Sequence, residues 1–146
     1  MNKFLLDVFQ LFAPYKLSQA ANPDAIAERE YASAAEIGFT QFTSCIGVIA
    51  KEGPTLTAVH LVAATGKEHI FNTNDVSKVL GRLPKKPDAV SIVGSIDIWE
   101  DQANGKVLTA AFQKLTDSLQ NLAKDYRGDG KYGARIAGDT IVVFSK

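Results

Sequence analysis

The chain has 146 residues, of which 46% are hydrophobic and 22% charged, as expected for a globular domain. Sixteen basic and sixteen acidic residues cancel, so we expect neither nucleic acid nor an anionic membrane surface as a partner. One cysteine excludes an internal disulfide and favours a reducing environment. We expect the cytoplasm, or a reducing compartment reached by secretion without a classical signal peptide.

The pattern up to residue 35 predicts a helical N-terminal part. Apolar side chains at Phe4, Val8, Leu11 and Phe12 fit one face of an amphipathic helix. This stretch is too short to span a bilayer, so we expect no stable membrane insertion. Asn22-Pro23 predicts a second helix start, with the helix running to about Ala35 and with Ile26 and Tyr31 turned inward.

A hairpin follows, and it brings the two most reactive side chains of the chain together. Two β-rich runs flank the turn signal Lys51-Glu52-Gly53-Pro54. If the pairing is centred between Glu52 and Gly53, Cys45 lies directly opposite His60, with Cβ atoms roughly 5 Å apart. The pattern therefore predicts a nucleophile beside a base, in which the imidazole lowers the pKa of the thiol. A register slip of one residue would separate them.

The remaining sequence alternates helical and strand patterns. Asn74 predicts the cap of a helix over 76–83, and residues 89–99 read as a strand. An apolar stripe predicts a long helix over 107–126, and a final hairpin is expected around Gly138-Asp139. The predicted fold is α+β, a mostly antiparallel sheet or sandwich with flanking helices. We expect one domain over 1–146, helical over 1–35 and with its core over 39–146.

Other candidate residues favour structural roles. His69 has polar neighbours and is expected on a surface strand, whereas Trp99 is expected to cap the core. Two histidines and one cysteine, without HExxH or paired CxxC spacing, do not make a metal site. We therefore expect neither a metal nor another cofactor.

The stretch from Ser44 to Lys51, followed by Ala58-Val59-His60, resembles the active-site segment of the cytotoxic necrotizing factor catalytic domain. The chemotaxis receptor deamidases resemble it more loosely. Both groups are glutamine deamidases with a Cys–His pair, and the similarity covers roughly twenty residues. The glycine that usually precedes the nucleophile is Ser44 here.

This resemblance implies a cysteine hydrolase that deamidates a glutamine side chain of a protein substrate such as a small GTPase. It also implies a bacterial effector or toxin, and we expect a monomer. Cys45 would attack, His60 would be the base, and Thr43 would orient it, with Thr40 or a backbone carbonyl as alternatives. The N–H groups of Ser44 and Cys45 would hold the oxyanion. A non-catalytic interaction domain with a buried Cys45, or a transglutaminase, remains open.

Overall fold

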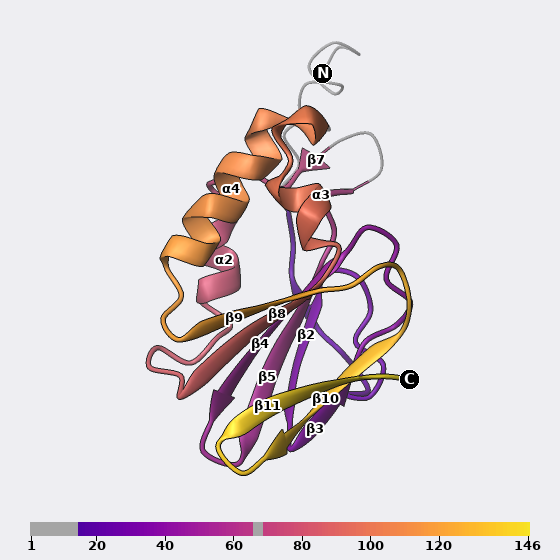
Figure 1. Ribbon diagram of the computed structural model, residues 1–146, viewed down its shortest axis with the longest axis vertical. Coiled ribbons are helices and arrows are strands. Elements are labelled where there is room, and N and C mark those ends of the chain that lie inside the picture. Colours follow the sequence, from indigo (N-terminus) through magenta and orange to yellow (C-terminus); the bar gives the residue numbers. More distant parts are fainter. Residues whose placement is uncertain (1–14, 66–68) are drawn as a thin grey trace, which may run out of the picture.

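Six strands form the main sheet of the computed structural model, which describes residues 15–65 and 69–146 (Figure 1). Neighbouring strands are antiparallel except at the two edges, where β1 pairs with β2 and β8 with β9 in parallel. In spatial order the strands are β1 (Ser18–Gln19), β2 (Glu30–Ala34), β5 (Thr55–Leu61), β4 (Ile46–Glu52), β8 (Ala89–Gly94) and β9 (Leu122–Tyr126).

A second, three-stranded antiparallel sheet packs against the main one. Its strands in spatial order are β11 (Thr140–Ser145), β10 (Tyr132–Ala137) and β3 (Glu36–Gly38). The β10–β11 hairpin turns at Gly138-Asp139, as the sequence predicts, and Gly138 has the positive φ of 61° that this turn needs. A short pair, β6 (Ala64–Thr65) and β7 (His69–Ile70), stands apart from both sheets.

Helices gather at one end of the sheets, opposite the β10–β11 hairpin (Figure 1). The crossover between the parallel strands β8 and β9 contains α3 (Ile96–Glu100), η1 (Gln102–Asn104) and α4 (Lys106–Asp117), and α2 (Val76–Leu80) packs on α4. The predicted α+β class is confirmed. Within the described ranges, no helix is both long and apolar enough to cross a bilayer.

Three of the predicted elements are wrong in part. The helix expected to run to about Ala35 is replaced by turns and strand β2, whose backbone pairs with β5. The strand expected over 89–99 ends at Gly94, and the helix expected over 107–126 ends at Asp117, with β9 following. The predicted helix near the N-terminus lies outside the described residues.

The β4–β5 register also differs from the predicted one. Glu52 pairs with Thr55, so the turn is Gly53-Pro54 and the pairing is centred one position later in the chain. Gly47 therefore lies opposite His60, and Cys45, which precedes β4, lies diagonally from it. Because the shift moves the partner by two residues, Cys45 keeps the side of the sheet that His60 occupies.

His69 lies in a strand as predicted, but its expected surface position is wrong. The side chain is buried, and its Nε2 atom lies 2.6 Å from Oδ2 of the buried Asp75. Asp75 also accepts a hydrogen bond from Lys78. A polar side chain can be buried when a charged partner satisfies it, which its sequence neighbours do not reveal. Trp99 is buried in the core, as predicted.

Gly47 provides a test of the packing around His60. A Cβ atom on Gly47 would lie 2.5 Å from Cζ of the buried Phe39 ring. We expect Gly47→Ala to lower the free energy of unfolding by about 1–3 kcal/mol in urea denaturation, because the core must shift to admit the methyl group. Gly128→Ala is the control, since a Cβ there meets nothing within 4 Å. Equal stability of the two variants would contradict this packing.

Candidate functional site

His60 lies in the interior between the two sheets. Its side chain has no exposed surface, and it contacts the rings of Phe39 and Phe42, with ring centroids 5.7 and 4.7 Å away. Its Nδ1 atom lies 2.9 Å from the backbone carbonyl of Ile26. A carbonyl can only accept, so Nδ1 carries the proton and Nε2 holds a lone pair. In the described part of the chain, Nε2 is buried without a hydrogen-bond partner.

A turn before β2 holds the imidazole and its backbone together. Ile26 is fully buried and supplies the carbonyl, while the N–H of Arg29 donates to the carbonyl of His60 at 2.8 Å. Arg29 has a positive φ of 61°, which brings the turn back toward β5. A backbone carbonyl, one of the alternatives open from the sequence, is therefore the group that fixes the His60 tautomer.

Cys45 is held at the start of β4 by its own backbone. Its side chain is completely buried, and its thiol donates a hydrogen bond to the carbonyl of Thr43 at 3.3 Å. The N–H of Ser95 donates to the Cys45 carbonyl at 3.0 Å. Gly94 has a φ of +124°, and a Cβ there would lie 2.5 Å from that carbonyl. Only glycine leaves room for this close approach.

Ser44 takes up a left-handed conformation that a glycine would adopt easily. Its φ is 58°, which costs a residue with a side chain roughly 1–2 kcal/mol. Both of its backbone groups have partners: its N–H donates to Oδ1 of Asp129 at 2.9 Å, and its carbonyl accepts from Nε1 of Trp99 at 3.0 Å. One of the two expected oxyanion donors is thus occupied by a carboxylate.

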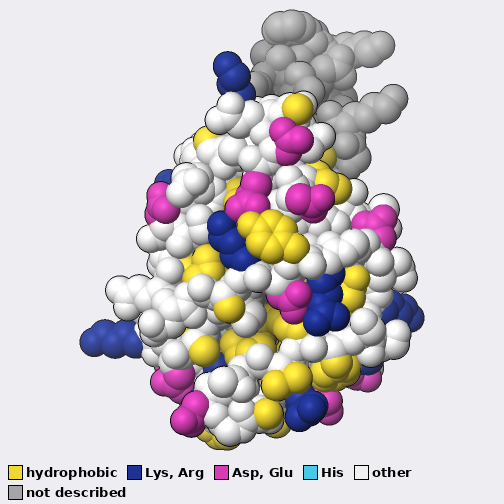
Figure 2. Space-filling view, in the orientation of Figure 1, with side chains coloured by type: hydrophobic (Ala, Val, Ile, Leu, Met, Phe, Trp, Pro, Cys, Tyr) yellow, Lys and Arg dark blue, Asp and Glu magenta, His cyan; other side chains and the backbone are white. Residues whose placement is uncertain are grey.

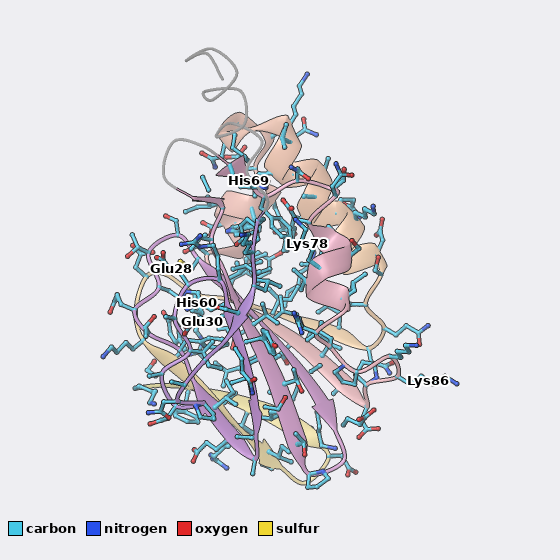
Figure 3. All side chains as sticks on the ribbon, turned by 180° about the vertical axis from the view of Figure 1, so that it is seen from behind. Glu28, Glu30, His60, His69, Lys78 and Lys86 are labelled. Carbon is cyan, nitrogen blue, oxygen red and sulfur yellow. The ribbon has the colours of Figure 1, made fainter. Side chains whose placement is uncertain are left out.

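The surroundings keep both reactive groups neutral. Burial raises the pKa of Cys45, and the carboxylates of Glu28 and Asp129 act in the same direction. The expected lowering of the thiol pKa is therefore wrong for this conformation. Burial also lowers the pKa of His60, against the effect of the Ile26 hydrogen bond and of Glu28 and Glu30. Figure 3 shows Glu28 and Glu30 beside His60.

The predicted site residues differ in how closely their positions match the expected roles. Continuing the β4–β5 register by one residue puts Cys45 on the side of the sheet that His60 occupies, and both side chains are buried. Thr43 contributes a carbonyl to the thiol. Sequence reasoning missed Ile26 and Asp129, because a backbone carbonyl has no sequence signature and Asp129 lies in a glycine-flanked loop 85 residues from Ser44.

The chain was compared with protein families, curated proteins and solved structures. Neither a protein-family model nor a curated protein matches the chain. A solved structure, the C-terminal domain of CNFy from Yersinia pseudotuberculosis, is similar with a TM-score of 0.41 and 15% sequence identity. The match covers 77% of this chain, and this chain spans 50% of the length of that structure.

The lowered pKa of His60 makes stability depend on pH. The unfolded chain takes up a proton at pH values where the buried imidazole does not, so protonation favours unfolding below the ordinary histidine pKa. We expect the urea midpoint to fall as the pH is lowered from about 7 to about 5, and to fall less in His60→Gln. His69→Gln retains His60, so the part of the decrease in urea midpoint that is due to His60 should remain. An equal fall in wild type and His60→Gln would exclude a buried neutral His60.

Proposed function

We propose that this protein is a cysteine hydrolase that deamidates a glutamine side chain of a protein substrate. The observation that carries the proposal is the Nε2 atom of His60, which is buried without a partner in the described part of the chain. Continuing the β4–β5 register by one residue puts Cys45 on the same side of the sheet. Burying an unpaired ring nitrogen costs stability, so its retention favours a chemical role. The resemblance of the Cys45–His60 segment to glutamine deamidases supports the same chemistry.

In this mechanism the Ile26 carbonyl keeps the proton on Nδ1 and leaves Nε2 as the base. Nε2 takes the thiol proton of Cys45 as the sulfur attacks the carboxamide carbon of the substrate. The resulting imidazolium then protonates the departing ammonia, which leaves a thioester. Water hydrolyses the thioester to glutamate and restores the thiol. The oxyanion would be held by the backbone N–H groups of Ser44 and Cys45.

The free protein is not yet arranged for this reaction. Cys45 lies diagonally from His60, and its thiol donates to Thr43 instead. Diagonal neighbours are about 7–8 Å apart, with Cβ atoms somewhat closer, so the proton moves only after the thiol turns or through one water molecule. A neutral thiol and a neutral imidazole suit such a resting state, because neither has to be stabilised as a buried charge. The resemblance further suggests a bacterial effector or toxin and a small GTPase as the substrate.

A non-catalytic interaction domain is the second candidate, and it is favoured by the complete burial of Cys45. In that case the thiol is a small apolar group of the core. Iodoacetamide would then label Cys45 only in the unfolded protein. The catalytic proposal instead requires labelling of the folded protein, because a substrate must be able to reach the same sulfur.

The chemistry is tested with a panel of small GTPases and with cell lysate. We expect ammonia release and one glutamine-containing peptide heavier by about 1 Da, the change from an amide to an acid. Cys45→Ser should abolish the reaction, and His60→Gln should slow it by about 10²–10⁴-fold through loss of the base. His69→Gln, whose side chain bonds to Asp75 instead, is the matched control and should keep the activity.

The absence of any deamidated product would contradict the proposal. No mass change in either the panel or the lysate, with wild type and Cys45→Ser indistinguishable, would leave the interaction domain as the better explanation. Added primary amine separates deamidation from amine transfer, since a transglutaminase would attach the amine to the same glutamine.

A further inference from the structure

Two observations show that the candidate nucleophile is covered in the free protein. The thiol of Cys45 has no exposed surface. The N–H of Ser44, which would help to hold an oxyanion, already donates to Asp129. A substrate carboxamide therefore needs both access to the sulfur and the release of Ser44 from this carboxylate.

The backbone around Asp129 is anchored, so its side chain is the part that is able to move. Phe42 and Gly130 exchange two backbone hydrogen bonds of 2.7 and 3.2 Å, and the hydroxyl of Tyr132 donates to the Gly128 carbonyl at 2.7 Å. The side chain of Asp129 is exposed between these anchors. Rotation about its own bonds frees the Ser44 amide without moving the loop.

Asp129 also lines a shallow groove of about 390 Å³. Asp97 lines the same groove, and neither carboxylate forms an ion pair with a described residue. The one cation of the lining, Arg127, is paired with Asp125 at 3.0 Å. Figure 2 shows several acidic side chains over α3 on this face. The groove next to Ser44 is therefore negatively charged.

We propose that Asp129 is a specificity-determining residue of the candidate site, released from the Ser44 amide by a basic side chain that flanks the target glutamine. The inference rests on the proposed function. The incoming cation pairs with the Asp129 carboxylate, and the freed N–H of Ser44 becomes available to the substrate oxygen. One residue thus selects the substrate and completes the oxyanion site. Neutralising Asp129 also removes one of the charges that raise the pKa of Cys45.

The first test uses thiol labelling, which does not depend on deamidase activity. Three probes are applied to the intact protein at low salt and followed by mass spectrometry: neutral iodoacetamide, a trimethylammonium-ethyl methanethiosulfonate, and the anionic sulfonatoethyl analogue. Relative to their rates with a free small-molecule thiol, we expect the cationic reagent to react about tenfold faster than the anionic one. In Asp129→Asn and Asp129→Ala this preference should disappear, and iodoacetamide should label Cys45 faster.

Asp139→Asn is the matched control, because Asp139 is an exposed aspartate at the tip of the β10–β11 hairpin. It should keep the wild-type rates and the charge preference. Melting temperatures of all variants exclude labelling through global unfolding. Unchanged iodoacetamide rates in both Asp129 variants, or an unchanged charge preference, would overturn the proposal.

The second test uses two synthetic heptapeptides with a central glutamine flanked by arginine or by glutamate. Ammonia release by wild type should favour the arginine peptide by about tenfold, and Asp129→Asn should lose this preference. Equal rates for the two peptides with wild type would overturn the proposal. If neither peptide is deamidated, the proposed function is what fails, and the charge preference of labelling still decides the role of Asp129.

Discussion

The site depends on one buried hydrogen bond, from Nδ1 of His60 to the carbonyl of Ile26. It fixes the ring tautomer and therefore decides that the lone pair is on Nε2. In the same turn, the N–H of Arg29 donates to the backbone carbonyl of His60, so the turn before β2 is bonded to both the ring and the backbone of His60. Gly47 lies opposite the ring, and its missing side chain leaves the space that Phe39 fills. The architecture near β5 is thus built around an uncharged histidine.

Keeping this histidine uncharged has a consequence for the thiol of Cys45. A thiolate in the same interior would lack a cation, and the carboxylates of Glu28 and Asp129 disfavour it further. The free protein therefore holds a protonated thiol that donates to Thr43. A protonated thiol and an uncharged imidazole leave this interior without a charge that would need a buried partner.

The conformation of Ser44 links this interior to the surface. Its left-handed backbone is held from two directions, by Trp99 in the helical layer and by Asp129 in the loop before β10. A strained residue persists where its surroundings determine it, and such positions cluster at functional sites. The backbone just before Cys45 is therefore connected both to the core through Trp99 and to the charged groove through Asp129.

Features that depend on local chemistry follow from the sequence alone. Turn residues predict the hairpins around Gly53-Pro54 and Gly138-Asp139, which the structure contains. Strand alternation keeps Cys45 on the side of His60 when the observed register is continued by one residue. The exact register depends on which two residues form the turn. The predicted pairing is centred on Glu52-Gly53, whereas the observed turn is Gly53-Pro54, one position later.

Other features depend on contacts between distant parts of the chain. The apolar stripe of α4 continues in sequence into Leu122, but Asn121 has a φ of 55° and the next residues pair with β8 instead. Helical periodicity does not predict this change from helix to strand, because the backbone hydrogen bonds come from β8, which is distant in the sequence. The partners of His60 and Ser44 were hidden for the same reason. A backbone carbonyl at Ile26 and a loop carboxylate at Asp129 reach their partners only once separate parts of the chain have packed together.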